Sequence, residues 1–181
     1  MSKNAIPLII DALAFAADKH RDQRRKDKDA SPYINHPVTL AHVLAFEGGI
    51  TDPIALAGAL LHDTVEDTET TYEELVSRFG TEIADVVMEV TDDKSLPKAT
   101  RKELQVEHAP HMSTAGRLVK IADKISNLRD VATSPPADWS QERCRKYADW
   151  AKRVVDALGP VSPELNASFE KAYSSVVKLS K

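Results

Sequence analysis

Apolar residues recur along the chain at the three- and four-residue spacing of a helix, whereas the alternating β-branched runs typical of strands are scarce. A first apolar stripe, over about residues 4–21, consists of Ile6, Ile9, Ile10, Leu13, Ala16 and Ala17. A second stripe, over residues 115–130, consists of Leu118, Ile121, Ala122, Ile125 and Leu128. The pattern therefore predicts an all-α fold.

Capping residues, prolines and glycines predict where the helices begin and end. His36-Pro37 is expected to open a helix with proline at its first position, and Gly48-Gly49 to close it. Other expected caps and stops are Thr51 or Asp52, the capping box Thr71-x-x-Glu74, Gly80, Thr81, Ser140, Gly159 and Ser162. The sequence of residues 92–114 predicts a loop, a helix and a second loop. We expect one domain, residues 1–181, of roughly eight to ten helices.

Composition narrows the possible partners and locations. The chain has 181 residues and a net charge of −4, which argues against nucleic acid as a bulk electrostatic partner. Neither a secretory signal nor an apolar run of the roughly 18 residues needed to span a membrane is present. The single cysteine, Cys144, excludes an intrachain disulfide and a cysteine-built zinc site. We therefore expect a cytoplasmic protein.

The segment LLHDTVEDT places four ionisable groups directly after the apolar run IALAGALL, with no intervening glycine or proline. A His-Asp pair taken alone is more often a surface or capping feature than a site. Here, however, Glu66 follows His62 by four residues, and Asp67 follows Asp63 by four, which brings each pair together if the helix persists. Three crowded carboxylates disfavour their own ionisation, and a divalent metal ion would remove that difficulty.

Further ligands for such an ion would come from distant segments. His36 lies at a helix start, where Pro37 restricts the preceding backbone. Asp123 lies on an otherwise apolar helical face and is costly to bury unless a positive charge meets it. Either a metal ion or an ion pair on the same helix, with Lys120, Lys124 or Arg129, would meet that need. Two histidines and two aspartates without a thiolate suit Mn²⁺ or Fe²⁺ at least as well as Zn²⁺.

The order R-K, YINHP, LLHDTVEDT and KIADKISNLRD resembles that of the HD-domain hydrolases of the RelA/SpoT kind. It is most similar to their stand-alone form, the small alarmone hydrolases related to the metazoan SpoT homologue. The resemblance extends over nearly the whole chain and implies an HD-domain helical bundle. The long relatives carry a synthetase domain after the hydrolase, but only two helices and no strand pattern are expected after Asp130, which excludes alarmone synthesis.

The resemblance also implies roles for individual residues. As metal ligands it implies His36, His62, Asp63 and Asp123, the same set that the crowded charges indicate. It implies that Glu66 and Asp67 orient and deprotonate the attacking water.

For the substrate, the resemblance implies that Asn127 contacts the nucleotide sugar, that Arg25 and Lys26 hold the base and phosphates, and that Tyr147 lies on the substrate side. A tyrosine at helical spacing with Trp150 is also typical of a core position. Cations occur in residues 19–29 and again around Lys98; such groups are usually a solvated face, but here they could balance substrate charge. We therefore include Lys98 among the expected substrate contacts.

The implied reaction is metal-dependent hydrolysis of the 3′-diphosphate of (p)ppGpp to GDP or GTP and pyrophosphate. Removal of the 2′-phosphate of NADPH and hydrolysis of (p)ppApp remain alternatives that the sequence does not rank. A non-catalytic alarmone sensor ranks lower, because all six acidic and histidine positions are present. The expected partner is a small-molecule nucleotide, with no obligate protein partner indicated. His20, His42, His108 and His111 are expected to be surface or packing residues.

Overall fold

The computed structural model describes residues 5–25, 27 and 29–179, and over this part of the chain the fold is entirely helical. Its ten α-helices confirm the predicted fold class. The first half of the chain contains α1 (Ala5–Lys19), α2 (Asn35–His42), the π-helical turn η1 (Val43–Glu47), α3 (Pro53–Leu61), α4 (Thr64–Asp67), α5 (Tyr72–Phe79) and α6 (Thr81–Val90). The second half contains α7 (Lys98–His108), the 3-10 turn η2 (Ala109–His111), α8 (Thr114–Thr133), α9 (Gln141–Leu158) and α10 (Pro163–Leu179).

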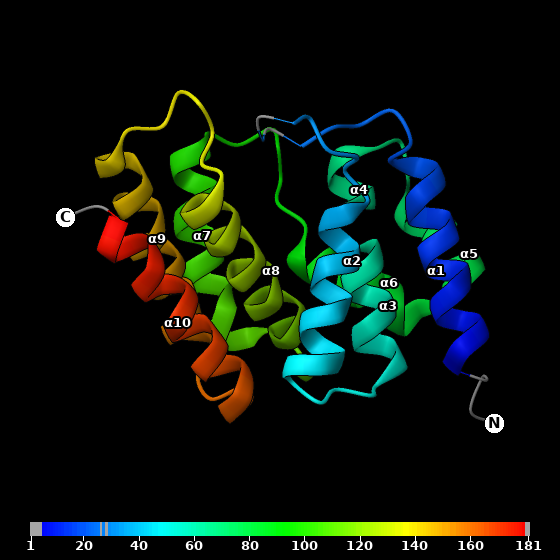
Figure 1. The fold of residues 1–181 in the computed structure, drawn as a ribbon. Coiled ribbons are helices and arrows are strands. Elements are labelled where there is room, and N and C mark those ends of the chain that lie inside the picture. Colours follow the sequence, from blue (N-terminus) through cyan, green and yellow to red (C-terminus); the bar gives the residue numbers. More distant parts are fainter. Residues whose placement is uncertain (1–4, 26, 28, 180–181) are drawn as a thin grey trace.

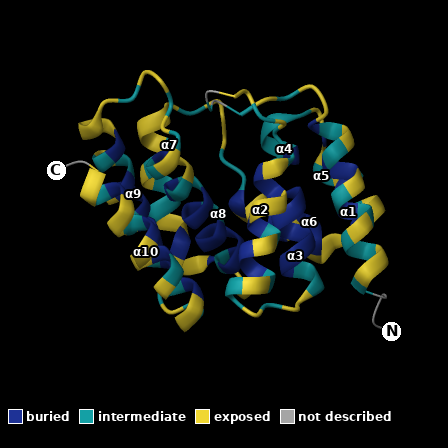
Figure 2. Ribbon diagram, in the orientation of Figure 1, coloured by how far each residue is buried: buried dark blue, intermediate teal, exposed yellow. Residues whose placement is uncertain are grey.

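Helices α3 and α8 pack against each other in the middle of the molecule, with α1 at one end and the α9 and α10 pair at the other (Figure 1). Helix α3 packs on α1, α2 and α6, and α8 packs on α2, α6, α9 and α10. Figure 2 shows buried residues gathered along α3, α6 and α8. Polar groups placed on the central helices are therefore removed from bulk water.

Every residue of α3 from Ala55 to Leu61 is buried, because other helices surround it. Close packing on α6 depends on Gly58: a Cβ atom there would lie 2.7 Å from Val86 Cγ1 and 3.6 Å from Val119 Cγ2. Such a contact with a branched buried side chain cannot be relieved by rotation of a flexible end. The glycine thus sets how closely α3 approaches α6.

Replacing Gly58 by alanine is expected to lower the free energy of unfolding by about 1–3 kcal/mol, the usual cost of overpacking a core. Urea denaturation of the variant and the parent protein measures this difference. The same substitution in a Val86→Ala background should cost less, since the clashing Cγ1 atom is absent. Equal costs in both backgrounds would contradict this explanation.

Most predicted helix boundaries are confirmed by hydrogen bonds of the capping side chains. Asp52 accepts from the Ile54 N–H, Thr71 from that of Glu74 and Ser140 from that of Arg143. The prediction for Thr81 is wrong: it is the first residue of α6, and the cap position belongs to Gly80, whose φ of +92° suits a residue without a Cβ atom.

Two local predictions near the HD segment are corrected. Helix α2 begins at Asn35, which places Pro37 third in the helix instead of first. Helix α3 does not persist through the motif but ends at Leu61, and α4 begins at Thr64 after a short turn. The side chains of His62 and Thr64 bond the carbonyl groups of Ala59 and Leu61, which stabilises this end of α3 without glycine or proline.

Candidate active site

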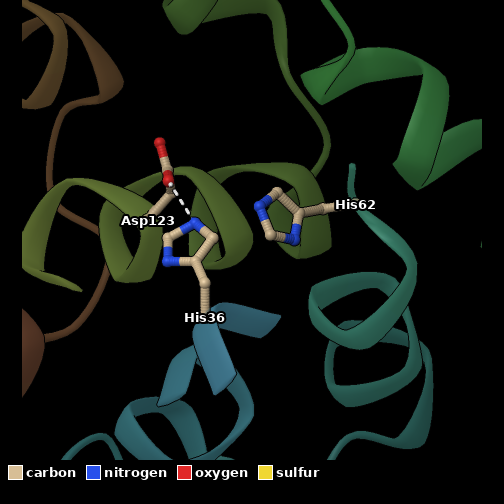
Figure 3. A group of neighbouring side chains, drawn as sticks. All are labelled: His36, His62 and Asp123. Carbon is tan, nitrogen blue, oxygen red and sulfur yellow. Dashed lines mark ion pairs between the residues drawn. The ribbon is translucent and has the colours of Figure 1, made fainter. Parts of the chain in front are cut away.

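Three helices bring the predicted metal ligands together. His36 comes from the start of α2, His62 and Asp63 from the turn after α3, and Asp123 from the middle of α8. Figure 3 shows the side chains of His36, His62 and Asp123 facing one another, and one ligand atom from each of these three lies within 4.8 Å of the others. Residues separated by up to 87 positions along the chain thus share one buried place.

Asp63 completes this group through one carboxylate oxygen. Its Oδ2 atom lies 2.9 Å from His62 Nε2 and 3.9 Å from His36 Nε2, while Asp123 Oδ1 lies 3.3 Å from His36 Nε2. Tyr33 donates its hydroxyl proton to the same Asp63 Oδ2 atom over 2.5 Å and so fixes the carboxylate. Two imidazole nitrogens and two carboxylates therefore converge.

The nitrogen of His62 that faces this group is suited to bind a cation. The other ring nitrogen, Nδ1, lies 2.8 Å from the carbonyl oxygen of Ala59, which can only accept, so Nδ1 carries the proton. The Nε2 atom is buried and, although it lies 2.9 Å from Asp63 Oδ2, makes no hydrogen bond of suitable geometry among the described residues. A neutral imidazole oriented in this way presents its lone pair to the cluster, as metal-binding histidines do.

The pKa shifts of Asp123 and His62 also indicate that the cluster favours a bound cation. Burial alone would raise the pKa of Asp123, but Lys124 and His36 outweigh it and hold the pKa well below its ordinary value. Burial lowers the pKa of His62, but the carboxylate of Asp63 outweighs it and the net effect raises that pKa. The site therefore attracts positive charge at the position of the imidazole nitrogens, and the donor set fits a divalent ion.

Of the ion pairs expected for Asp123 on its own helix, only the one with Lys124 is formed among the described residues. Lys124 contacts Asp123 Oδ2 at 3.0 Å, leaving Oδ1 for His36 and for the Asn127 amide at 2.5 Å. Lys120 instead donates to the carbonyl oxygen of Val90 at 3.0 Å. Arg129 pairs with Glu47 on the far side of the helix. One oxygen of Asp123 thus binds a lysine while the other faces the histidines.

Glu66 and Asp67 line the same cavity of about 210 Å³ as the histidines. Glu66 accepts a hydrogen bond from the Asp92 N–H at 3.0 Å, and burial raises the pKa of its carboxyl. Asp67 accepts hydrogen bonds from Gln23 and from Lys94. Both carboxylates are therefore held in place at the edge of the predicted metal site.

A second cavity of about 530 Å³ adjoins the first, and Arg25 and Asn127 line both. Arg25 forms an ion pair with Asp130, and its guanidinium lies 5.7 Å from the centre of the Tyr33 ring. Tyr147 lines this second cavity as well, so it is both a partly buried residue packed against the core and part of the cavity wall. Lys26 lies outside the described residues.

A third cavity, of about 230 Å³, contains Lys98 and shares Tyr147 with the second. Its wall is rich in cations and aromatic rings: Lys98, Arg101, Lys102, Arg143, Lys146, Trp139, Tyr147 and Trp150. Most of these were not predicted from the sequence, because α7, α9 and the loop before α9 supply them from segments about 40 residues apart. Only the cations around Lys98 gave a local signal.

Two other site residues had no assigned role in the sequence. Tyr33 lies within YINHP, three residues before His36, so its position close to a predicted ligand was a usable signal. Lys120 was considered only as a partner of Asp123, yet it lines the first cavity, where burial lowers its pKa to about 8.

No helix of the described residues combines the length and apolar character needed to cross a bilayer.

Comparison with known proteins agrees with this geometry. Residues 12–154 match the family described as HD domain. The guanosine-3′,5′-bis(diphosphate) 3′-pyrophosphohydrolase MESH1 of Xenopus tropicalis is 55% identical over 158 residues, which cover 87% of this chain and 88% of that protein. The human protein of the same name is 50% identical and covers 91% of this chain and 92% of its own length.

A solved structure described as a metazoan ortholog of SpoT that hydrolyses ppGpp superposes with a TM-score of 0.89. It is 44% identical, and the match covers 92% of this chain and 94% of that one. A longer relative from Aquifex aeolicus, a guanosine-3′,5′-bis(diphosphate) 3′-pyrophosphohydrolase, is 39% identical, but the match covers only 21% of its length. The chain therefore belongs to the HD-domain family and, within it, to the group formed by the metazoan SpoT ortholog and the MESH1 proteins.

Proposed function

We propose that the protein hydrolyses the 3′-diphosphate of (p)ppGpp to GDP or GTP and pyrophosphate. The observation that carries this proposal is the convergence of two histidines and two aspartates beside Glu66 and Asp67, in a cavity open to a larger one that could receive a nucleoside. Relatives about half identical over nine-tenths of the chain are named for this activity. As part of the same proposal, residues 1–181 form a single HD-type domain that works in the cytoplasm without an obligate protein partner.

A divalent ion would be held by His36, His62, Asp63 and Asp123, and we propose Mn²⁺, with Fe²⁺ or Zn²⁺ as alternatives. Such an ion supplies Lewis-acid polarisation of a phosphoryl oxygen and lowers the pKa of water. The absence of thiolate among these residues and the presence of two carboxylates support Mn²⁺ as the first choice.

Glu66 and Asp67 would orient the attacking water and accept its proton. The raised pKa of the Glu66 carboxyl supports its role as the base, because a base works best when its pKa approaches the working pH. Asp67 is held by Gln23 and Lys94 and would aim the water at the phosphorus atom. Lys120 and Lys124, which line the same cavity, would balance the charge of the diphosphate.

The nucleoside would occupy the second cavity, with Asn127 at the sugar and Arg25 together with Lys26 at the base and phosphates. Tyr147 separates this cavity from the third one, where Lys98 and neighbouring cations would meet the 5′-phosphates. Positive side chains concentrated around these cavities let a chain of net negative charge bind a strongly anionic substrate.

Product identification tests the proposal directly. Purified protein loaded with Mn²⁺ is expected to convert ppGpp to GDP and pyrophosphate in equal amounts, measured by ion-exchange chromatography. Release of orthophosphate instead would indicate a phosphatase. Tight ppGpp binding without any phosphate release would favour a sensor.

Phosphate removal from NADPH is a second candidate, favoured by the aromatic wall of the third cavity. Beyond the nucleoside cavity, Trp139, Tyr147 and Trp150 line the third cavity with aromatic rings on which a second ring system could stack. Turnover of ppGpp, pppApp and NADPH under identical conditions ranks the three substrates. A strong preference for NADPH would overturn the first choice.

A further inference from the structure

His20 is buried directly after α1 and contacts none of the predicted ligands or catalytic carboxylates. Only 2% of its surface is exposed. Its Nδ1 atom lies 2.7 Å from Oε1 of Gln23, and Gln23 Nε2 in turn donates to Asp67 Oδ2 at 3.1 Å. One histidine without an assigned role is therefore linked to a carboxylate at the edge of the active site.

The chemistry of these three groups fixes the direction of each hydrogen bond. An ionised carboxylate only accepts, so the amide nitrogen of Gln23 must face Asp67, and its oxygen must face His20. The Nδ1 atom of His20 must then carry the proton. If Gln23 turned over, its oxygen would face the carboxylate, and the hydrogen bond that holds Asp67 would be lost.

The ring of His20 also contacts Tyr33, which holds a predicted metal ligand. Its centre lies 4.9 Å from that of the Tyr33 ring, whose hydroxyl donates to Asp63 at 2.5 Å. The Nε2 atom of His20 is buried without a hydrogen-bond partner among the described residues. A buried ring nitrogen without a hydrogen bond lowers the stability of the fold. If residue 20 served only to fill space, an apolar aromatic side chain would therefore stabilise the fold more than histidine.

We propose that His20 is a positioning residue for the hydrolytic reaction: through its Nδ1 proton it fixes the amide of Gln23, and through that amide it aims the carboxylate of Asp67 at the attacking water. This inference rests on the proposed function. It assigns to His20 and Gln23, for which the sequence indicated no role in the site, the task of holding the reactive oxygen of Asp67 in one orientation.

The test separates this role from packing. His20→Phe keeps a flat ring against Tyr33 but removes the Nδ1 donor. We expect kcat for ppGpp to fall about 10- to 100-fold, the usual loss when a group supporting an active-site residue is removed. KM and the Mn²⁺ affinity measured by isothermal titration calorimetry should stay unchanged, since the variant touches neither substrate nor ligands.

Two further variants keep the test decisive if His20→Phe folds poorly. Gln23→Met, at a half-buried position, breaks the middle link and should lose kcat to the same extent. His20→Asn restores a short donor near the Nδ1 position and should recover part of the rate. As a matched control, His111→Phe, at the exposed end of η2, should leave kcat unchanged.

A double-mutant cycle with Asp67→Asn supplies the readout that a packing role would not give. If His20 acts through Asp67, His20→Phe should cost no further kcat in the Asp67→Asn background. An equal loss in both backgrounds, or wild-type kcat in His20→Phe, would overturn the inference while leaving the proposed function intact. A wild-type protein that releases no pyrophosphate would overturn the proposed function itself.

Discussion

Replacing Asp63 by asparagine is expected to abolish metal retention and ppGpp turnover together. The substitution preserves the shape of the side chain and an oxygen that can accept from Tyr33, so the fold around the site should be kept. It removes one of two negative charges that face the imidazole nitrogens, which lie 2.9 Å and 3.9 Å from Asp63 Oδ2. A lost ion forfeits several kcal/mol of transition-state stabilisation, a rate loss of ~10³-fold or more.

Metal content after gel filtration, measured by inductively coupled plasma mass spectrometry, and pyrophosphate release check this prediction in parallel. His62→Ala should behave like Asp63→Asn, because it removes the Nε2 atom that faces the cluster. As a matched control, Asp11→Asn removes a carboxylate of α1 that pairs with Arg78, far from the cluster, and should change neither quantity. Full turnover by a metal-free Asp63→Asn protein would rule out the ligand role.

Replacing Glu66 by glutamine is expected to keep the metal but lose the rate. The amide oxygen can still accept from the Asp92 N–H, so the side chain should stay in position. An amide cannot take a proton from water, and loss of a general base lowers kcat about 10²- to 10⁴-fold. Substrate affinity should change little, since the residues proposed to hold the nucleotide belong to other segments of the chain.

The metal contents of Glu66→Gln and Asp63→Asn distinguish a general base, whose loss leaves the metal bound, from a metal ligand, whose loss releases it. Glu69→Gln is the matched control, because Glu69 lies in the same segment but is exposed and should be dispensable. Should Glu66→Gln lose metal as readily as Asp63→Asn, Glu66 would be a ligand and the proposed division of roles would be wrong.

The local part of the fold could be predicted from the sequence. Apolar periodicity located the long helices, and Asp52, Thr71 and Ser140 cap them as expected, because a cap needs only its own side chain and the next few N–H groups. Thr81 failed as a cap for an equally local reason: Gly80 already ends one helix and begins the next. The helix break at His62 was missed, since side chains and not glycine or proline stabilise it.

The sequence by itself also selected His36, His62, Asp63 and Asp123, because several acidic groups in apolar surroundings require a shared positive charge. Only the tertiary structure decided which charges meet: Lys124 rather than Lys120 pairs with Asp123, and α7 and α9 together build the basic cavity. The link from His20 through Gln23 to Asp67 was likewise invisible in the sequence, and the place of Tyr33 near His36 gave no sign of its contact with Asp63. Contacts between helices depend on how whole elements pack, and no periodicity within one segment records that arrangement.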